Sequence, residues 1–260
     1  MGSDEKRDHE RARRRALARE AGVEPPAENT RDPEEAPAPS VHRILSRLGS
    51  SSRETREACT DLLVARGGEA VPALIGALGH ASPLVRFHSA QALGAIGDER
   101  AIEPLVERLS DREENRGSVA AGAEAALRAF GVRAVPALLA QLGCAPDEVL
   151  TRVVRLLGDI GSDVGTGVPE EPLRRLLREA GEYVRAQAAA AVRKVLGAGA
   201  IPDLLATLDD PSRWVRLAAA EALAHLGRPE ARPVLEAILA GAEDAYEARW
   251  AEELLELLPG

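Results

Sequence analysis

The sequence contains few aromatic residues: two phenylalanines, two tyrosines and two tryptophans make up 2% of its 260 residues. A compact globular domain normally uses large rings to fill its core, so this shortage argues against one. Hydrophobic residues nevertheless account for 45% of the chain, and alanine, leucine and valine supply most of them. This composition favours helices that pack closely through small side chains.

Cysteine and long apolar runs are also scarce, which excludes two further classes of protein. Cys59 and Cys144 are the only cysteines, so the chain has neither a disulfide framework nor a cysteine cluster at metal-ligand spacing. No run of about 18 apolar residues is present to span a membrane. The first residues are charged, unlike those of a signal peptide. We therefore expect a cytoplasmic protein with no membrane partner.

Positive charge is in deficit, and the deficit is localised. The formal net charge is −9, yet residues 1–50 contain ten basic and ten acidic side chains. The whole excess of negative charge therefore lies in residues 51–260, where it repels phosphate backbones. We expect the partner not to be a nucleic acid.

Residues 1–40 differ in composition from the rest of the chain. They contain five prolines and many charges but hardly an apolar side chain, so they have little to bury. Residues 11–19 form a basic patch that is a candidate for a transient helix. We predict a disordered arm over residues 1–40 and one repeat domain over residues 41–260.

From residue 41 onward the sequence repeats itself with a period near 31. The clearest copies are residues 83–109, 183–208 and 214–239. Within each copy, apolar and small residues recur at i, i+4, i+7, i+8 and i+11, which is one face of an α-helix. Such sets begin at Thr55, Val85, Val119, Val149, Val184, Val215 and Tyr246, the first and last being the weakest. Internal repetition of this length is typical of stacked architectures.

Glycine and proline divide each copy into two helices. A glycine follows the first helix at Gly97, Gly131, Gly161 and Gly227, where it supplies a left-handed cap. A proline then opens a shorter second helix, which tolerates it in the first turn. We predict an all-α fold, a right-handed α-α superhelix of about six helical hairpins plus capping helices. Longer spacings place insertions at residues 111–118 and 161–171.

The pattern V-R-x-x-A-A-x-A-L-G-x-I-G followed by A-I-x-P-L, matched best by residues 85–97 and 101–105, resembles the HEAT-like repeat of phycobiliprotein lyase subunits. The resemblance covers about residues 41–260 and implies an α solenoid. Proteins with such repeats include scaffolds, lyase subunits, a hydroxylase and a DNA glycosylase, so the resemblance alone selects no function.

The residues that catalysis would need are not arranged for it. The hydroxylase uses His-Glu pairs, but no histidine of the repeats is followed by glutamate, and we expect His88 and His225 to face solvent or a helix end. A glycosylase would stack a base on aromatic side chains. Tyr183 and Trp214 each precede a buried valine in their helices, so we interpret them as packing between repeats, with a stacking platform as the alternative. We expect no catalytic residue, metal or other cofactor.

Arginines recur directly after the buried valine of the first helix, at Arg86, Arg185 and Arg216, with Arg56 in the aligned place. We interpret them as a ladder of ion pairs between repeats, with acids at the preceding turn such as Asp209 and Asp210. The alternative is an anion-binding ladder. Among the cysteines, we expect Cys59 to be buried and Cys144 to be exposed.

The remaining candidate is a binding surface on the second helices, which we expect to line a concave wall. Its partner-binding residues are predicted to be Arg47, Glu107, Arg108, Gln141, Arg175, Thr207 and Glu236. They suit a helix or an extended peptide, whereas the alternative is a merely solvated face. We therefore expect a non-enzymatic protein-protein interaction scaffold, with no indication of a small-molecule ligand. The alternative function is a lyase-like subunit of an enzyme that modifies a partner protein or its prosthetic group.

Overall fold

The computed structural model describes residues 12–13, 16–23, 39–111, 119–165, 167–242 and 245–259, apart from the side chains at positions 246 and 247. The chain consists of two compact units, Met1–Phe130 and Gly131–Gly260, and each unit is described by itself. In both units every regular element within these residues is an α-helix or a 3-10 turn.

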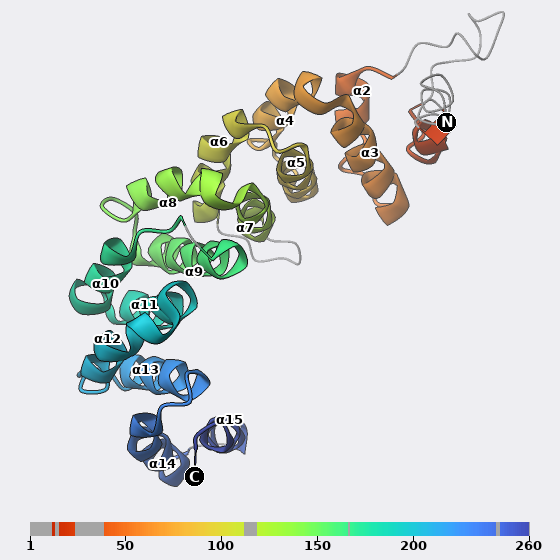
Figure 1. Ribbon diagram of the computed structural model, residues 1–260. Coiled ribbons are helices and arrows are strands. Elements are labelled where there is room, and N and C mark those ends of the chain that lie inside the picture. Colours follow the sequence, from red (N-terminus) through yellow and green to blue (C-terminus); the bar gives the residue numbers. More distant parts are fainter. Residues whose placement is uncertain are drawn as a thin grey trace, which may run out of the picture. The chain divides into compact units, whose positions relative to one another are not determined.

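The first unit pairs long and short helices. Its helices are α2 (Val41–Leu45), α3 (Arg53–Arg66), α4 (Val71–Ala77), α5 (Pro83–Ile96), α6 (Ile102–Glu107) and α7 (Val119–Phe130). The long helices α3, α5 and α7 pack side by side, and the short helices form a second layer beside them (Figure 1). Within this unit, α4 packs on α5 and α6 packs on α7.

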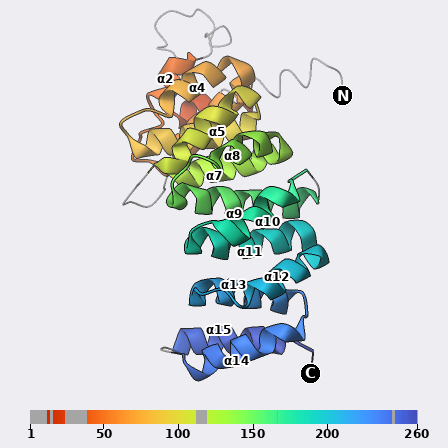
Figure 2. The ribbon, with the colours of Figure 1, turned by 90° about the vertical axis from the view of Figure 1, so that its left-hand side faces the viewer.

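The second unit repeats this arrangement. Its helices are α8 (Val135–Gln141), α9 (Asp147–Val164), α10 (Glu170–Glu179), α11 (Glu182–Leu196), α12 (Ile201–Thr207), α13 (Arg213–His225), α14 (Arg232–Ala240) and α15 (Ala245–Glu256). The long helices α9, α11 and α13 lie in successive repeats, and each packs against the next (Figure 2). The fold is therefore an all-α solenoid of stacked helical hairpins, as the sequence predicts.

The predicted helix faces form the core. In α5, Val85, Ala92 and Leu93 are buried, and Val184 and Val192 of α11 are fully so. Burial of an aliphatic side chain of this size stabilises the fold by about 1.5–3 kcal/mol. A proline is the second residue of four short helices, α4, α8, α12 and α14, as predicted.

The glycine caps are confirmed with one exception. Gly97, Gly131 and Gly227 have φ values of 73°, 59° and 67°. Gly161 does not end its helix: α9 continues to Val164 and is capped by Gly165 with φ 74°. A Cβ at position 161 would lie 2.6 Å from Val195 Cγ2, so this glycine is needed for close packing. The predicted insertion at 161–171 is thus partly an extension of a helix, whereas the one at 111–118 lies, beyond residue 111, outside the described residues.

Part of the N-terminal segment is structured, which corrects one expectation. Residues 16–20 form a helical turn, and Ala21 and Val23 are fully buried in the first unit. A Cβ added at Gly22 would lie 2.9 Å from Arg47 Nη2, so the two residues are close neighbours. The expectation that residues 1–40 have little to bury is therefore wrong for this stretch, where Ala18, Ala21 and Val23 are buried. The predicted disorder of the remainder concerns mostly residues outside those described.

No helix in the described part of the chain combines the length and apolar character needed to cross a membrane.

Candidate partner-binding site

Arg185 links two successive repeats of the second unit. Its Nε and Nη2 atoms donate to the two carboxylate oxygens of Asp210, both at 2.8 Å, and its Nη1 donates to the carbonyl of Ala180 at 2.8 Å. The side chains of Arg185 and Asp210 are only 16% and 10% exposed. The hydrogen bonds from Arg185 lower the pKa of the Asp210 carboxyl. The predicted ladder of ion pairs between repeats is confirmed at this step.

The details differ from the expectation in one respect. The carboxylate of Asp210 accepts from Arg185, the arginine of the preceding repeat. Arg216 instead donates to the backbone carbonyl of Asp210 at 2.8 Å. The carboxylate of Asp210 therefore pairs with the arginine of the preceding repeat and not with Arg216. Each of these arginines orders the loop before its own helix.

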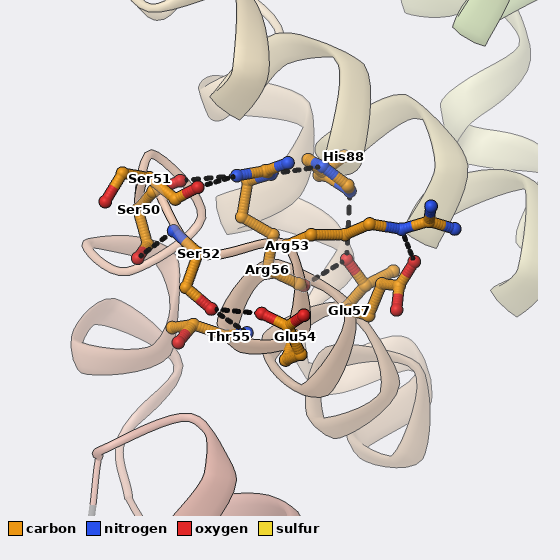
Figure 3. A network of polar contacts seen from close by, with 10 residues as sticks. Ser50, Ser51, Ser52, Arg53, Glu54, Thr55, Arg56, Glu57 and His88 are labelled. Carbon is orange, nitrogen blue, oxygen red and sulfur yellow. Dashed lines mark hydrogen bonds and ion pairs between the residues drawn. The ribbon is translucent and has the colours of Figure 1, made fainter.

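The same arrangement occurs in the first unit (Figure 3). Arg56 donates to the carbonyls of Ser50 and Ser51 at 2.7 and 3.0 Å, and to Nε2 of His88 in the next repeat at 3.1 Å. His88 lies within α5 and is buried, with 7% of its surface exposed, which corrects the expectation that it faces solvent or a helix end. Burial and the Arg56 charge lower its pKa. His225, by contrast, is exposed as predicted.

Arg86 holds its preceding loop in the same way, and it also borders a small pocket. It donates to the carbonyl of His80 at 2.8 Å and lies 3.5 Å from the Asp111 carboxylate, which Arg108 also approaches to 3.5 Å. These three side chains, with Gly79 and Ser110, line about 420 Å³ of space. Because one acid faces two arginines that also serve the fold, this pocket is a weaker candidate than the next site.

The second unit carries a larger groove across the beginnings of three neighbouring long helices. Its volume is about 650 Å³, and it is lined by Asp147, Glu148, Thr151, Tyr183, Ala186, Gln187 and Trp214. We call it the aromatic groove. Tyr183 is 64% exposed and Trp214 is 58% exposed. They are the second residues of α11 and α13, so two repeats present an aromatic ring at the same place.

This exposure corrects the interpretation of the two aromatics as packing between repeats. The residues that follow them, Val184 and Val215, are fully buried. An α-helix has 3.6 residues per turn, so neighbouring side chains differ by about 100° in direction. The residue before a buried valine therefore points away from the core. The repeat in the sequence identified the positions of Tyr183 and Trp214 as equivalent. The geometry of the helix determines that both side chains face solvent.

Acidic side chains flank the rings. Asp147 and Glu148 occupy the first turn of α9, and Asp147 lies directly against Gly181, where a Cβ would not fit. Glu148 is 4.0 Å from Arg152. None of the residues that line the groove is basic. The groove thus combines exposed aromatic surface with negative charge.

The seven residues predicted to bind a partner have mixed positions. Arg47, Glu107, Arg175 and Glu236 are exposed, while Arg108 and Gln141 are half-buried. Thr207 is buried, with its hydroxyl donating to the carbonyl of Asp203 at 2.7 Å. Its expected outward position is wrong because the last turn of α12 faces the core at that residue. None of the seven lines the aromatic groove.

The described residues also bear on metal and thiol chemistry. Among them, no group of three or more His, Cys, Asp or Glu side chains is placed to hold a metal ion. Cys59 is fully buried, as predicted, and burial raises the pKa of its thiol to about 11. Cys144 is exposed, also as predicted. A thiol with so high a pKa is a poor nucleophile.

The family model of HEAT repeats matches residues 41–128 and 168–256, well over half of the chain. The chain belongs to the HEAT repeat family. No curated protein matches it.

Solved structures that match this chain include a lyase complex, a hydroxylase and a designed armadillo repeat protein. The CpcE–CpcF complex of phycocyanin lyase from Nostoc sp. PCC7120 is 20% identical, with a TM-score of 0.39, and the match covers 90% of this chain and 100% of that one. Human deoxyhypusine hydroxylase is 20% identical, with a TM-score of 0.34 and coverage of 98% and 99%. A designed armadillo repeat protein in complex with the peptide (KR)4 is 22% identical, with a TM-score of 0.40 and coverage of 85% and 100%.

Proposed function

We propose that this HEAT repeat protein is a non-enzymatic scaffold that binds a partner polypeptide in the aromatic groove. The observation that carries the proposal is the exposure of Tyr183 and Trp214 at the same place in adjacent repeats. Exposing two large rings to water costs free energy that burial against a partner recovers. Tyrosine and tryptophan are also the side chains most often found at the energetic centre of protein interfaces.

The aromatic groove stands out against the rest of the described surface. The exposed large hydrophobic side chains there are Val132, Val164, Tyr183, Trp214 and Leu257. Only the two aromatics among these five line the same hollow. Isolated exposed aliphatic residues are normal on a protein surface, whereas a shared hollow lined by rings is typical of a binding site.

The groove suits binding better than catalysis. Its described lining contains no histidine, cysteine, lysine or arginine. A hydrolytic or transfer reaction needs a nucleophile with an adjacent base, or a donor that stabilises developing negative charge. Asp147 and Glu148 are the bases that the lining offers, but it holds no donor such as lysine, arginine or histidine to stabilise developing negative charge beside Thr151 or Tyr183. The alternative function, a lyase-like subunit acting on a partner or its prosthetic group, stays a prediction that no feature of the groove favours.

A capture experiment with matched baits tests the proposal. Tyr183→Ala/Trp214→Ala removes both rings from exposed positions, so the bait should keep its melting temperature. Leu257→Ala is the control, because it removes an exposed apolar side chain elsewhere in the same unit. We expect proteins recovered by the wild-type and Leu257→Ala baits to be lost with the groove variant. Equal recovery by all three baits would refute a role for the groove, and chromophores in the eluate would favour the lyase-like alternative.

The exposed residues of the second helices are a separate proposed surface. Arg175 is 63% exposed and forms an ion pair with Glu179, one turn along α10, at 3.6 Å. The same capture experiment with an Arg175→Glu bait tests it. Loss of partners with this bait, but not with the groove variant, would move the binding site to the second helices.

A further inference from the structure

We infer that the aromatic groove binds an arginine side chain presented by an extended segment of the partner. This inference rests on the proposed function and names the chemistry that the groove selects. Three features carry it: the charge of the lining, the pair of rings and the size of the hollow.

The charge of the lining selects a cation. Asp147 and Glu148 contribute two carboxylates, and no lining residue is basic. Arg152 approaches Glu148 to only 4.0 Å, so it offsets part of one charge. The N-terminal end of α9 adds a partial positive charge of about half an elementary charge. The balance remains negative, so the groove attracts a cation and repels carboxylates and phosphates.

The rings select the kind of cation. A guanidinium or ammonium group over the face of tryptophan or tyrosine is attracted by the ring's quadrupole. Arginine is favoured over lysine because its planar group is weakly hydrated, stacks on rings and can form two hydrogen bonds with one carboxylate. Tyr183 and Trp214 supply ring faces, and Asp147 or Glu148 supplies the carboxylate. The aliphatic stem of arginine would lie along Ala186.

The size of the hollow calls for more than one side chain. Its volume of about 650 Å³ lies in the middle of the range for ligand sites, roughly 300–1,000 Å³. The rings come from two different helices, α11 and α13, and the carboxylates from a third, α9. A segment several residues long, extended across these helices, fits this layout. A single-stranded nucleic acid also offers stacking surfaces, but its phosphates would meet the two carboxylates.

Three peptides and the full chain test the inference. The probes are blocked octapeptides that differ only at alternate positions, which hold arginine, citrulline or glutamate. Citrulline keeps the planar shape of arginine and removes its charge. We expect the arginine peptide to bind, measured by calorimetry, and the citrulline peptide to bind about tenfold more weakly because the cation–π attraction is lost. The glutamate peptide should not bind, and added salt should weaken the arginine peptide.

Two sets of variants locate the binding. Asp147→Asn/Glu148→Gln keeps the shape of the groove and removes its charge, and we expect the arginine peptide to bind about fivefold to tenfold more weakly. Tyr183→Ala/Trp214→Ala should abolish its binding. The control Glu252→Gln removes one exposed charge from α15, outside the groove, and should change nothing. Unchanged melting temperatures will show that the variants fold.

Several outcomes would overturn the inference. These are no binding of the arginine peptide, equal binding of the arginine and citrulline peptides, groove-dependent binding of a thymidine oligonucleotide, or self-association of the protein through the groove. Its failure is distinguishable from that of the proposed function. If captured partners depend on the two rings but survive Asp147→Asn/Glu148→Gln, the scaffold function stands and the arginine specificity is wrong. If partners survive loss of the rings, both are wrong.

Discussion

Replacing Gly94 with alanine should destabilise the first unit, although alanine is the better helix former. Gly94 lies within α5, where a Cβ would be 2.7 Å from the Cα atom and 2.8 Å from the Cβ atom of Ala126 in α7. Carbon atoms in contact normally lie about 3.5–4.0 Å apart. The two helices would therefore have to separate by about 1 Å along this line, and both sides would lose packing contacts.

The magnitude follows from two opposing effects. Overpacking in a close-packed core costs about 1–3 kcal/mol. Replacing glycine by alanine within a helix recovers about 0.5–1 kcal/mol. The difference between these two effects runs from about 0 to 2.5 kcal/mol, and we expect Gly94→Ala to lower the free energy of unfolding by about 1–2 kcal/mol, near the centre of that range. For a chain of this size that corresponds to a fall of about 2–8 °C in melting temperature.

Gly76→Ala is the matched control. Gly76 lies in α4 of the same unit, and a Cβ there would have no atom within 4 Å. It should therefore gain the helix preference alone, about 0.5–1 kcal/mol. Urea unfolding followed by circular dichroism measures both changes. If Gly94→Ala unfolds at the same urea concentration as the wild type or a higher one, the close contact between α5 and α7 does not limit stability and the reasoning is wrong.

Three further outcomes are expected. His88 is buried and its pKa is lowered in the folded chain. As the pH falls, the imidazole of His88 is therefore protonated in the unfolded chain before it is protonated in the folded one. Stability should therefore fall as the pH drops below the unfolded value of about 6.5, and His88→Gln should flatten that part of a melting-temperature profile. Arg185→Gln should lower the free energy of unfolding by about 1–3 kcal/mol, since it breaks hydrogen bonds to a charged group, whereas Arg175→Gln should stay within about 0.5 kcal/mol; equal urea midpoints would contradict this. Val23→Ser should lower stability by about 1–2 kcal/mol, and an unchanged melting temperature would show that residues 16–23 do not pack on the first unit.

The repeat architecture was predictable because its signal is redundant. The face of valine, alanine and leucine that begins at Val85 recurs in most of the copies, so an error in one copy does not affect the prediction for the next. Glycine caps were predictable for the same reason, since only glycine readily takes the left-handed conformation. Gly161 was wrongly predicted to be a cap because glycine is also used where two helices pack closely. Spacing in the sequence does not distinguish these two roles.

The candidate groove was only half predictable. The recurrence of Tyr183 and Trp214 identified a place that the repeat holds constant, but a single residue's direction depends on the helix start and on its neighbours. His88 shows the same limit in the opposite sense. Its ring contacts Arg56 and Thr60, which lie one repeat earlier in the chain, and no local pattern around His88 contains that information. Residues 16–23 were missed because composition was averaged over a segment that is mostly polar.

The double use of Asp210 has a consequence for how such arrays can be recombined. Its loop depends on Arg185, 25 residues before it, and on Arg216, 6 residues after it. A chimera joined within that loop would take Arg185 from one parent and Arg216 from the other. Each arginine would then have to bind a loop that comes partly from a different protein. A junction in the middle of a long helix instead leaves the loop and the arginine after it in the same fragment. The unit that can be exchanged between such proteins therefore starts inside a long helix. Fragments should be joined there and not at the loops that separate the hairpins.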